Sequence, residues 1–328
     1  QFANDSTSSE QAKRFYPLYV LSGNFSLITL YPVLNHVVKN PDHDIQMVSA
    51  IVVLCGFVLV AFFRLVCARL RVEEESGMVV ASKPKSQKKK LSFTESIEVL
   101  LHSEYIGCIA LLVLSYGITS NLVELIWKAE VLELYPLRSD YMAFNRDYTF
   151  MTGIATALMN YFSKGIVRKM GWVVGAIITP ITAGVCSCLF FIFILNRETF
   201  SVLLLALNVA PMAFVVWFGA YGVLLTKGAK YSFFDPTKEM AFIPLDDDLR
   251  TNGKAAVDGI GARLGKSFGG AFASTLLMIM GSPKAIEIAP VLAVVVFLLT
   301  CVWIWSVLRL GVLYNRQLAI RAEEEALA

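Results

Sequence analysis

Residues 171–195 read GWVVGAIITPITAGVCSCLFFIFIL, a run of 25 residues without a charged side chain. At about 1.5 Å per residue, a helix of this length crosses a hydrocarbon core of about 30 Å. The rest of the 328-residue chain has the same character, since 56% of its residues are hydrophobic and 17% are charged, with a mean hydropathy of +0.61. Soluble domains contain roughly 25% charged residues. The sequence therefore predicts an all-α polytopic membrane protein.

Apolar blocks of this kind recur along the chain. Eight of them are long enough to be transmembrane helices: residues 14–38, 47–70, 104–128, 146–166, 171–195, 199–227, 255–281 and 286–313. Segment 93–102 is shorter and mixed in polarity, which is typical of an amphipathic helix at the membrane surface. We therefore expect eight transmembrane helices.

Lysine and arginine are distributed unevenly between alternate loops. The side that holds the N-terminal end carries 21 of these residues, and the opposite side carries six. By the positive-inside rule the first side is cytoplasmic. Because the number of spans is even, both chain ends then face the cytoplasm. The net charge of +3 is too small to indicate a nucleic-acid partner.

A Lys-rich polar connector follows the second span and organises the chain. We expect residues 71–103 to be a basic cytoplasmic linker that ends in the amphipathic helix. Its positive charge serves topology and contact with anionic lipid, or it serves regulation. Two spans precede it in residues 1–70, and six follow in residues 104–328. This is the outline of a twelve-span transporter built of two six-helix bundles, in which four more spans would precede Gln1.

Charged residues inside spans are costly, so each is a candidate for function. Asn121, Glu124 and Lys128 are spaced three and four residues apart and share one helical face. Either Glu124 and Lys128 form an ion pair at the membrane boundary, or this face lines an aqueous cavity.

Span 255–281 carries two cations three residues apart, Arg263 and Lys266, with Asp258 as an intrahelical counter-charge. A multiply anionic ligand would neutralise them, or acidic residues of other helices would. Glycines between 259 and 270 allow close approach of a neighbouring helix or of a ligand. The stretch GKS at 265–267 is no phosphate-binding P-loop, because Ile260 stands where that motif needs glycine. We find no nucleophile or metal motif, and expect no enzyme, metal or cofactor.

The cytoplasmic segment 230–246 reads KYSFFDPTKEMAFIPLD and is rich in aromatic residues. Asp235 is expected to cap a short helix that begins at Pro236. The segment either packs as a gating loop or brings Lys230 and Lys238 into contact with substrate.

This segment, with GKAAVD at 253–258 and LGKS at 264–267, closely resembles the ATP/ADP translocases of chlamydiae, rickettsiae and plastids. SNLVELIWK at 120–128 and AKRFYPL at 12–18 also look like segments of that family. The resemblance covers essentially the whole chain. It implies twelve spans with a fold similar to the major facilitator superfamily, of which this chain corresponds to the C-terminal two-thirds.

The resemblance also implies a secondary antiporter that exchanges ATP for ADP by alternating access. Glu124 and Lys266 match charged positions that the family needs. The phosphates would lie against Lys266 and Arg263, with Lys128 a weaker candidate. Asn121 and Glu124 would contact polar edges of the nucleotide or neutralise the cations of the empty site. A proton-coupled importer of nucleotides or NAD is the alternative.

Four residues, Lys230, Asp235, Lys238 and Asp258, are candidates for gating or for contact with substrate. The partners implied are ATP, ADP, phosphate as a further candidate, and the lipid bilayer, with the protein acting as a monomer. The expected location is the inner membrane of an intracellular bacterium, with the plastid inner envelope as the alternative.

Overall fold

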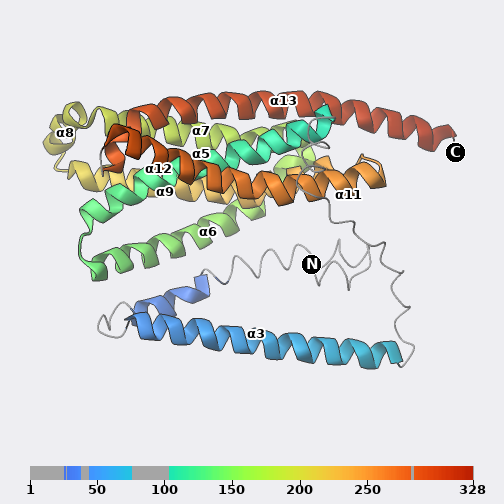
Figure 1. The fold of residues 1–328 in the computed structure, drawn as a ribbon, viewed down its shortest axis with the longest axis horizontal. Helices are drawn as coiled ribbons and strands as arrows, with labels where there is room; N and C mark the ends of the chain where they lie inside the picture. The colour runs from blue at the N-terminus through green and yellow to red at the C-terminus, as the bar shows by residue number, and fades with distance from the viewer. Residues whose placement is uncertain (1–25, 27, 38–43, 76–102, 282–283, 328) are drawn as a thin grey trace. The chain divides into compact units, whose positions relative to one another are not determined.

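The computed structural model describes residues 26, 28–37, 44–75, 103–281 and 284–327, and these ranges contain helices and no strand (Figure 1). The elements are α3 (Asp44–Glu75), α5 (Glu104–Leu134), α6 (Arg138–Met170), α7 (Trp172–Leu195), α8 (Arg197–Ala206), α9 (Pro211–Ala229), η2 (Lys230–Phe234), α10 (Asp235–Ala241), α11 (Asp247–Ala256), η3 (Val257–Gly261), α12 (Ala262–Met280), η4 (Ala285–Ile288) and α13 (Ala289–Leu327). The expected all-α class is confirmed. The expected linker and amphipathic helix at 71–103 lie almost wholly outside the described residues.

The chain divides into two compact units. The first comprises residues 1–89 and 142–150, and the second comprises residues 90–141 and 151–328. In the first unit, Arg146 donates a hydrogen bond to Asn35 (2.8 Å), pairs with Asp147 (2.7 Å) and lies over the ring of Tyr31. Helix α3 is apolar and its side chains are largely exposed within the described part of the chain.

The second unit is a bundle in which α5 packs against α13, α12 and α9, while α7 packs against α13 and α9 (Figure 1). Two buried polar side chains of its interior find partners on a neighbouring helix. The Trp127 indole donates to the carbonyl of Val216 (3.0 Å), and Ser306 donates to the carbonyl of Cys108 (2.7 Å). These bonds join α5 to α9 and to α13 without exposing polar groups to lipid.

Helices α5 and α12 approach closely because glycine faces the contact. A Cβ atom at Gly265 would lie 3.2 Å from Gly117 Cα, and one at Gly269 would lie 3.1 Å from Asn121 Cβ. The sequence-based expectation that these glycines admit a neighbouring helix is confirmed. Backbones in such contact gain dispersion energy without the entropy cost of ordering long side chains.

Helix α9 continues without a break through η2 into α10. Residues 230–234 form a π-helical turn, in which the backbone N–H of Asp235 donates to the carbonyl of Lys230. Two buried side chains tie α10 to the bundle: Tyr105 donates to the carbonyl of Ala241 (2.6 Å), and Trp172 donates to that of Thr237 (2.8 Å). The segment read as a cytoplasmic loop is therefore largely helical.

Five helices within the described ranges are long and apolar enough to cross a membrane: residues 45–69, 104–134, 172–195, 211–241 and 285–321. A shorter apolar helix covers 267–280. The chain is thus an integral membrane protein by length and composition of its helices. Expected span 146–166 lies within α6, which is too polar to join this set, and most of 14–38 lies outside the described residues. The number eight stays a prediction.

The expected span 199–227 is wrong as a single helix. The structure ends α8 at Ala206 and begins α9 at Pro211, with Asn208 between them at a φ of 57°. Asparagine tolerates this left-handed conformation, and proline fits the first turn of a helix because that turn needs no backbone N–H bond. Apolar residues at 202–207 and 209–210 flank Asn208, so the mean hydropathy of the segment conceals the turn.

Candidate functional site

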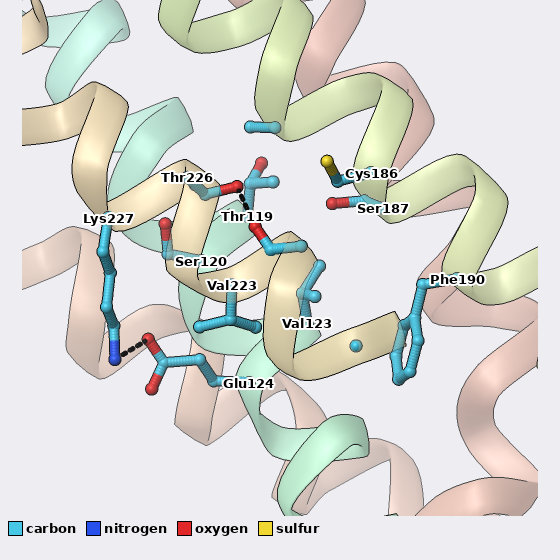
Figure 2. Close-up of a pocket in the computed structure, with 13 residues that line it drawn as sticks. Thr119, Ser120, Val123, Glu124, Cys186, Ser187, Phe190, Val223, Thr226 and Lys227 are labelled. Carbon is cyan, nitrogen blue, oxygen red and sulfur yellow. Dashed lines mark hydrogen bonds and ion pairs between the residues drawn. The ribbon is translucent and has the colours of Figure 1, made fainter. Parts of the chain in front are cut away.

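A pocket lies between α5, α7 and α9 in the second unit (Figure 2). The pocket is narrow, with enclosed room for little more than water, and part of it is open to solvent. The lining residues are Thr119, Ser120, Val123 and Glu124 of α5, Ala183, Cys186, Ser187 and Phe190 of α7, and Gly219, Gly222, Val223, Thr226 and Lys227 of α9.

Glycines on α9 let neighbouring side chains approach closely beside this pocket. A Cβ atom at Gly219 would lie 2.5 Å from the Trp127 ring and 2.7 Å from the Phe190 ring. One at Gly222 would lie 3.2 Å from the Cβ of Cys186. Side chains of α5 and α7 therefore pack directly against the α9 backbone at these two positions, and a larger residue at Gly219 would clash with them.

The pocket holds one carboxylate between two lysines. Glu124 Oε1 lies 3.2 Å from Lys227 Nζ on α9, and Glu124 Oε2 lies 3.2 Å from Lys128 Nζ one turn along α5. Figure 2 shows the Lys227 and Glu124 side chains pointing toward one another at one side of the pocket. The intrahelical pair expected from the sequence is present, and Glu124 is the residue of this face that lines the pocket. An aqueous cavity lined by the whole face stays a prediction.

The same pocket is lined by a buried hydroxyl group, that of Thr119. Thr119 is 1% exposed, and its Oγ1 has no hydrogen-bond partner within the described part of the chain. An unpaired buried hydroxyl is disfavoured by about 1–3 kcal/mol, so such groups in native proteins usually meet a ligand or water. The pocket thus offers a carboxylate, an ammonium group and several hydroxyl groups, of which that of Thr119 is unsatisfied, on a largely apolar wall.

The other predicted binding residues lie on the neighbouring pair of helices. Asn121 packs against Gly269 of α12 rather than lining the pocket with Glu124. Arg263 and Lys266 belong to α12, and their side chains lie outside the described part of the structure. The structure therefore groups Glu124 with Lys128 and adds Lys227. The prediction for Arg263 and Lys266 stays a prediction.

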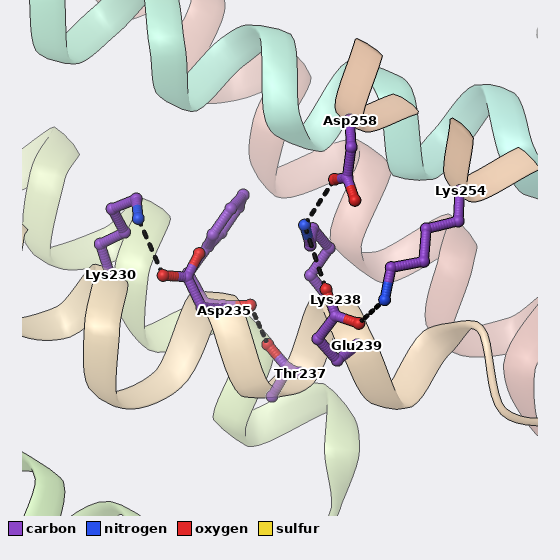
Figure 3. Close-up of polar contacts among 8 residues, drawn as sticks. Lys230, Asp235, Thr237, Lys238, Glu239, Lys254 and Asp258 are labelled. Carbon is purple, nitrogen blue, oxygen red and sulfur yellow. Dashed lines mark hydrogen bonds and ion pairs between the residues drawn. The ribbon is translucent and has the colours of Figure 1, made fainter. Parts of the chain in front are cut away.

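The four predicted gating residues form two ion pairs in one cluster (Figure 3). Lys230 Nζ lies 2.8 Å from Asp235 Oδ2, and Lys238 Nζ lies 2.8 Å from Asp258 Oδ1. Glu239 extends the second pair, because it also binds Lys238 (3.3 Å) and Lys254. Since α10 carries Lys238 and η3 carries Asp258, the cluster fastens α10 to the start of the seventh expected span.

One expectation for this cluster is wrong. Asp235 caps no helix, because the π-helical turn continues α9 into α10 and leaves no free helix start before Pro236. Its carboxylate binds Lys230 instead, five residues earlier, the spacing that a π turn brings together. Asp258 pairs with Lys238 of α10, and its role as a counter-charge to the cations of its own helix stays a prediction.

We predict that Lys238 and Asp258 are energetically coupled. Lys238 is largely buried, and it pairs with Asp258 on a different element. The losses of stability caused by Lys238→Met and Asp258→Asn should therefore not be additive in the double variant. The expected coupling is about 1 kcal/mol, read from thermal unfolding midpoints of the purified protein in detergent. Strictly additive losses would contradict it. Lys169→Met, on the exposed end of α6, is the matched control.

A further ion pair lies toward the other end of α5. Glu130 is 1% exposed and binds Arg197 at the start of α8. Sequence reasoning missed this pair, and it missed Lys227, Thr119 and the α7 wall of the pocket. Lys227 could have been noticed as a charged residue at the end of an apolar block. The sequence alone, however, does not show which helix faces it.

No group of three or more His, Cys, Asp or Glu residues in the described ranges is arranged to hold a metal ion. The site chemistry offered by these residues is that of ion pairing and hydrogen bonding. Lysines beside a partly open pocket suit an anionic ligand with several oxygen atoms.

These features define an α-helical integral membrane protein with a charged pocket between its spans. A family model described as the TLC ATP/ADP transporter matches residues 1–314, and the chain belongs to this family. The resemblance seen in the sequence is thereby confirmed.

Several relatives carry transporter names. The chain is 35% identical over 329 residues to ADP,ATP carrier protein 3 of Rickettsia felis, covering 95% of this chain and 65% of the relative. It is 36% identical over 318 residues to ADP,ATP carrier protein 1 of Rickettsia typhi (94% and 63%), and 33% identical over 338 residues to ADP,ATP carrier protein 1 of Chlamydia pneumoniae (99% and 65%). The chain thus spans slightly less than two thirds of these relatives. No solved structure matches it.

Proposed function

We propose that the protein exchanges ATP for ADP across a membrane by alternating access, as a secondary antiporter with both ends of this chain in the cytoplasm. The observation that carries the proposal is the family match over residues 1–314, together with relatives named as ADP,ATP carriers. Those relatives come from rickettsiae and chlamydiae, which supports the inner membrane of an intracellular bacterium as its location.

In this proposal the chain contributes to two helix bundles of a twelve-span protein with a fold like the major facilitator superfamily. Residues 1–70 supply the last two spans of one bundle, 71–103 form the cytoplasmic linker, and 104–328 form a six-helix bundle. The close packing of α5, α7, α9, α12 and α13 supports a single body for the last of these. The bundles would rock about a nucleotide held between them.

The charges of the spans support a nucleotide as cargo. Glu124, Lys128 and Lys227 lie together at the pocket, and Arg263 and Lys266 add two cations on α12. Phosphates of the nucleotide would bind these cations, and binding would neutralise charge that is otherwise costly within a membrane. An empty carrier would have to move this net positive charge between the two faces. Obligatory exchange follows from that cost.

Transport in liposomes tests the proposal with the full-length protein. Labelled ATP is expected to enter vesicles preloaded with ADP, and to stay outside empty vesicles, because only the loaded carrier reorients readily. Protein-free liposomes with internal ADP are the control. Uptake by empty vesicles that grows with an acidic exterior would overturn exchange and establish proton-coupled import of a nucleotide or NAD instead.

A further inference from the structure

One carboxylate of the pocket serves two cations on different helices. Glu124 uses Oε2 for Lys128, four residues along α5, and Oε1 for Lys227 on α9. The two distances are equal at 3.2 Å, so the two lysines share the carboxylate. The three groups together carry one net positive charge.

The two lysines differ in their relation to the pocket. Lys227 lines it and its side chain is 29% exposed, whereas the Lys128 side chain is 55% exposed and does not line it. An ammonium group beside water can keep its hydration shell, and one against an apolar wall needs a counter-charge. Of the two, Lys227 is the cation that depends more on an anionic partner.

One wall of the pocket is a stripe of α9 that ends at Lys227. Gly219, Gly222, Val223 and Thr226 follow one another at helical spacing on α9, and Lys227 stands at the end of this stripe. The Thr226 hydroxyl is held by the carbonyl of Gly222 (2.9 Å), which leaves the stripe smooth. On the opposite wall of the pocket, the Thr119 hydroxyl is buried and has no partner among the described residues.

We propose that Lys227 binds a phosphate group of the transported nucleotide, and that Glu124 is the internal counter-ion that occupies Lys227 while the site is empty. This inference rests on the proposed function. A phosphate carries more negative charge than a carboxylate and presents three acceptor oxygens. Its arrival releases Glu124 Oε1 from Lys227, while Oε2 stays with Lys128, so the carboxylate keeps a partner throughout.

The exchange of partners also changes how two helices are joined. The Glu124–Lys227 pair links α5 to α9, and the Glu124–Lys128 pair lies within α5 alone. Release of the first pair therefore removes an ionic link between the two helices at the moment when the ligand bridges them. Lys128 is thus a positioning residue, and Lys227 is a binding residue.

Binding of ATP, ADP and AMP to the full-length protein in lipid nanodiscs tests the assignment by calorimetry. For the wild type, affinity is expected to rise from AMP to ATP. Lys227→Gln should weaken ATP binding about tenfold or more and flatten that rise, because a charge-assisted contact is lost. Glu124→Gln should bind ATP as tightly as the wild type or several-fold more tightly, since the competing carboxylate is gone.

Three comparisons keep the test decisive. Lys227→Arg retains the charge and should recover most of the ATP affinity, and Lys169→Gln, an exposed lysine on α6, should leave it unchanged. If Glu124→Gln and Lys227→Gln weaken ATP binding equally, and the double variant is no worse, the pair is only structural and the inference is overturned. A wild type that exchanges nucleotides while Lys227→Gln keeps full ATP affinity overturns it as well. A wild type that binds no nucleotide overturns the proposed function itself.

Discussion

Lys266→Ala is expected to reduce ATP/ADP exchange to the level of protein-free liposomes while the protein is still made and inserted. Lys266 lies in α12, one residue after the glycine that contacts the backbone of α5. A lysine within a span is costly, and we expect it to be retained because it binds the phosphates of the cargo. Removing such a contact from a site that must hold each nucleotide once per cycle should lower exchange about a hundredfold or more.

The measurement is initial uptake of labelled ATP into ADP-loaded liposomes, normalised to reconstituted protein. Lys266→Arg keeps the charge and should retain part of the activity. Lys169→Ala removes an equal charge from the exposed end of α6 and should transport like the wild type. Exchange by Lys266→Ala at the wild-type rate would remove Lys266 from the phosphate site.

The second large effect concerns stability. Arg197→Met should lower the thermal unfolding midpoint in detergent by about 5 °C or more, because it leaves the carboxylate of Glu130 buried without its cation. A buried charge that loses its partner is disfavoured by about 3 kcal/mol or more. The variant should lower the unfolding midpoint more clearly than the transport rate, since this pair does not line the pocket.

A double variant isolates the cause. Glu130→Gln with Arg197→Met removes both charges, and we expect it to recover most of the lost midpoint because no uncompensated charge remains. Arg168→Met, at the exposed end of α6, controls for the loss of an arginine. A midpoint of Arg197→Met equal to that of the wild type would show that water reaches Glu130.

The class of fold was predictable because a bilayer demands long apolar helices, and such runs are plain in the sequence. The boundaries were predictable only where polarity changes. The turn between α8 and α9 lies inside an apolar run, so only Asn208 and Pro211 marked it. The π-helical turns at 230–234 and 257–261 leave no mark in a pattern read with the period of an α-helix.

The candidate site was predictable where it depends on one helix. The i, i+4 spacing of Glu124 and Lys128 gave their pair directly. The contact of Glu124 with Lys227 depends on how α5 lies against α9, and burial of Glu130 depends on the fold of α8. Contacts of this kind depend on tertiary packing, and a single sequence gives no information on the distances between helices.

The unbroken helix from Pro211 to Ala241 acts as a lever. Lys227 at the pocket and Lys238 in the ion-pair cluster lie on this one rod, about 15 Å apart along its axis. A tilt of about 10° about one of these points displaces the other by about 3 Å, as much as the length of an ion pair. A rotation of the helix at Lys227 therefore displaces Lys238, and a rotation at Lys238 displaces Lys227.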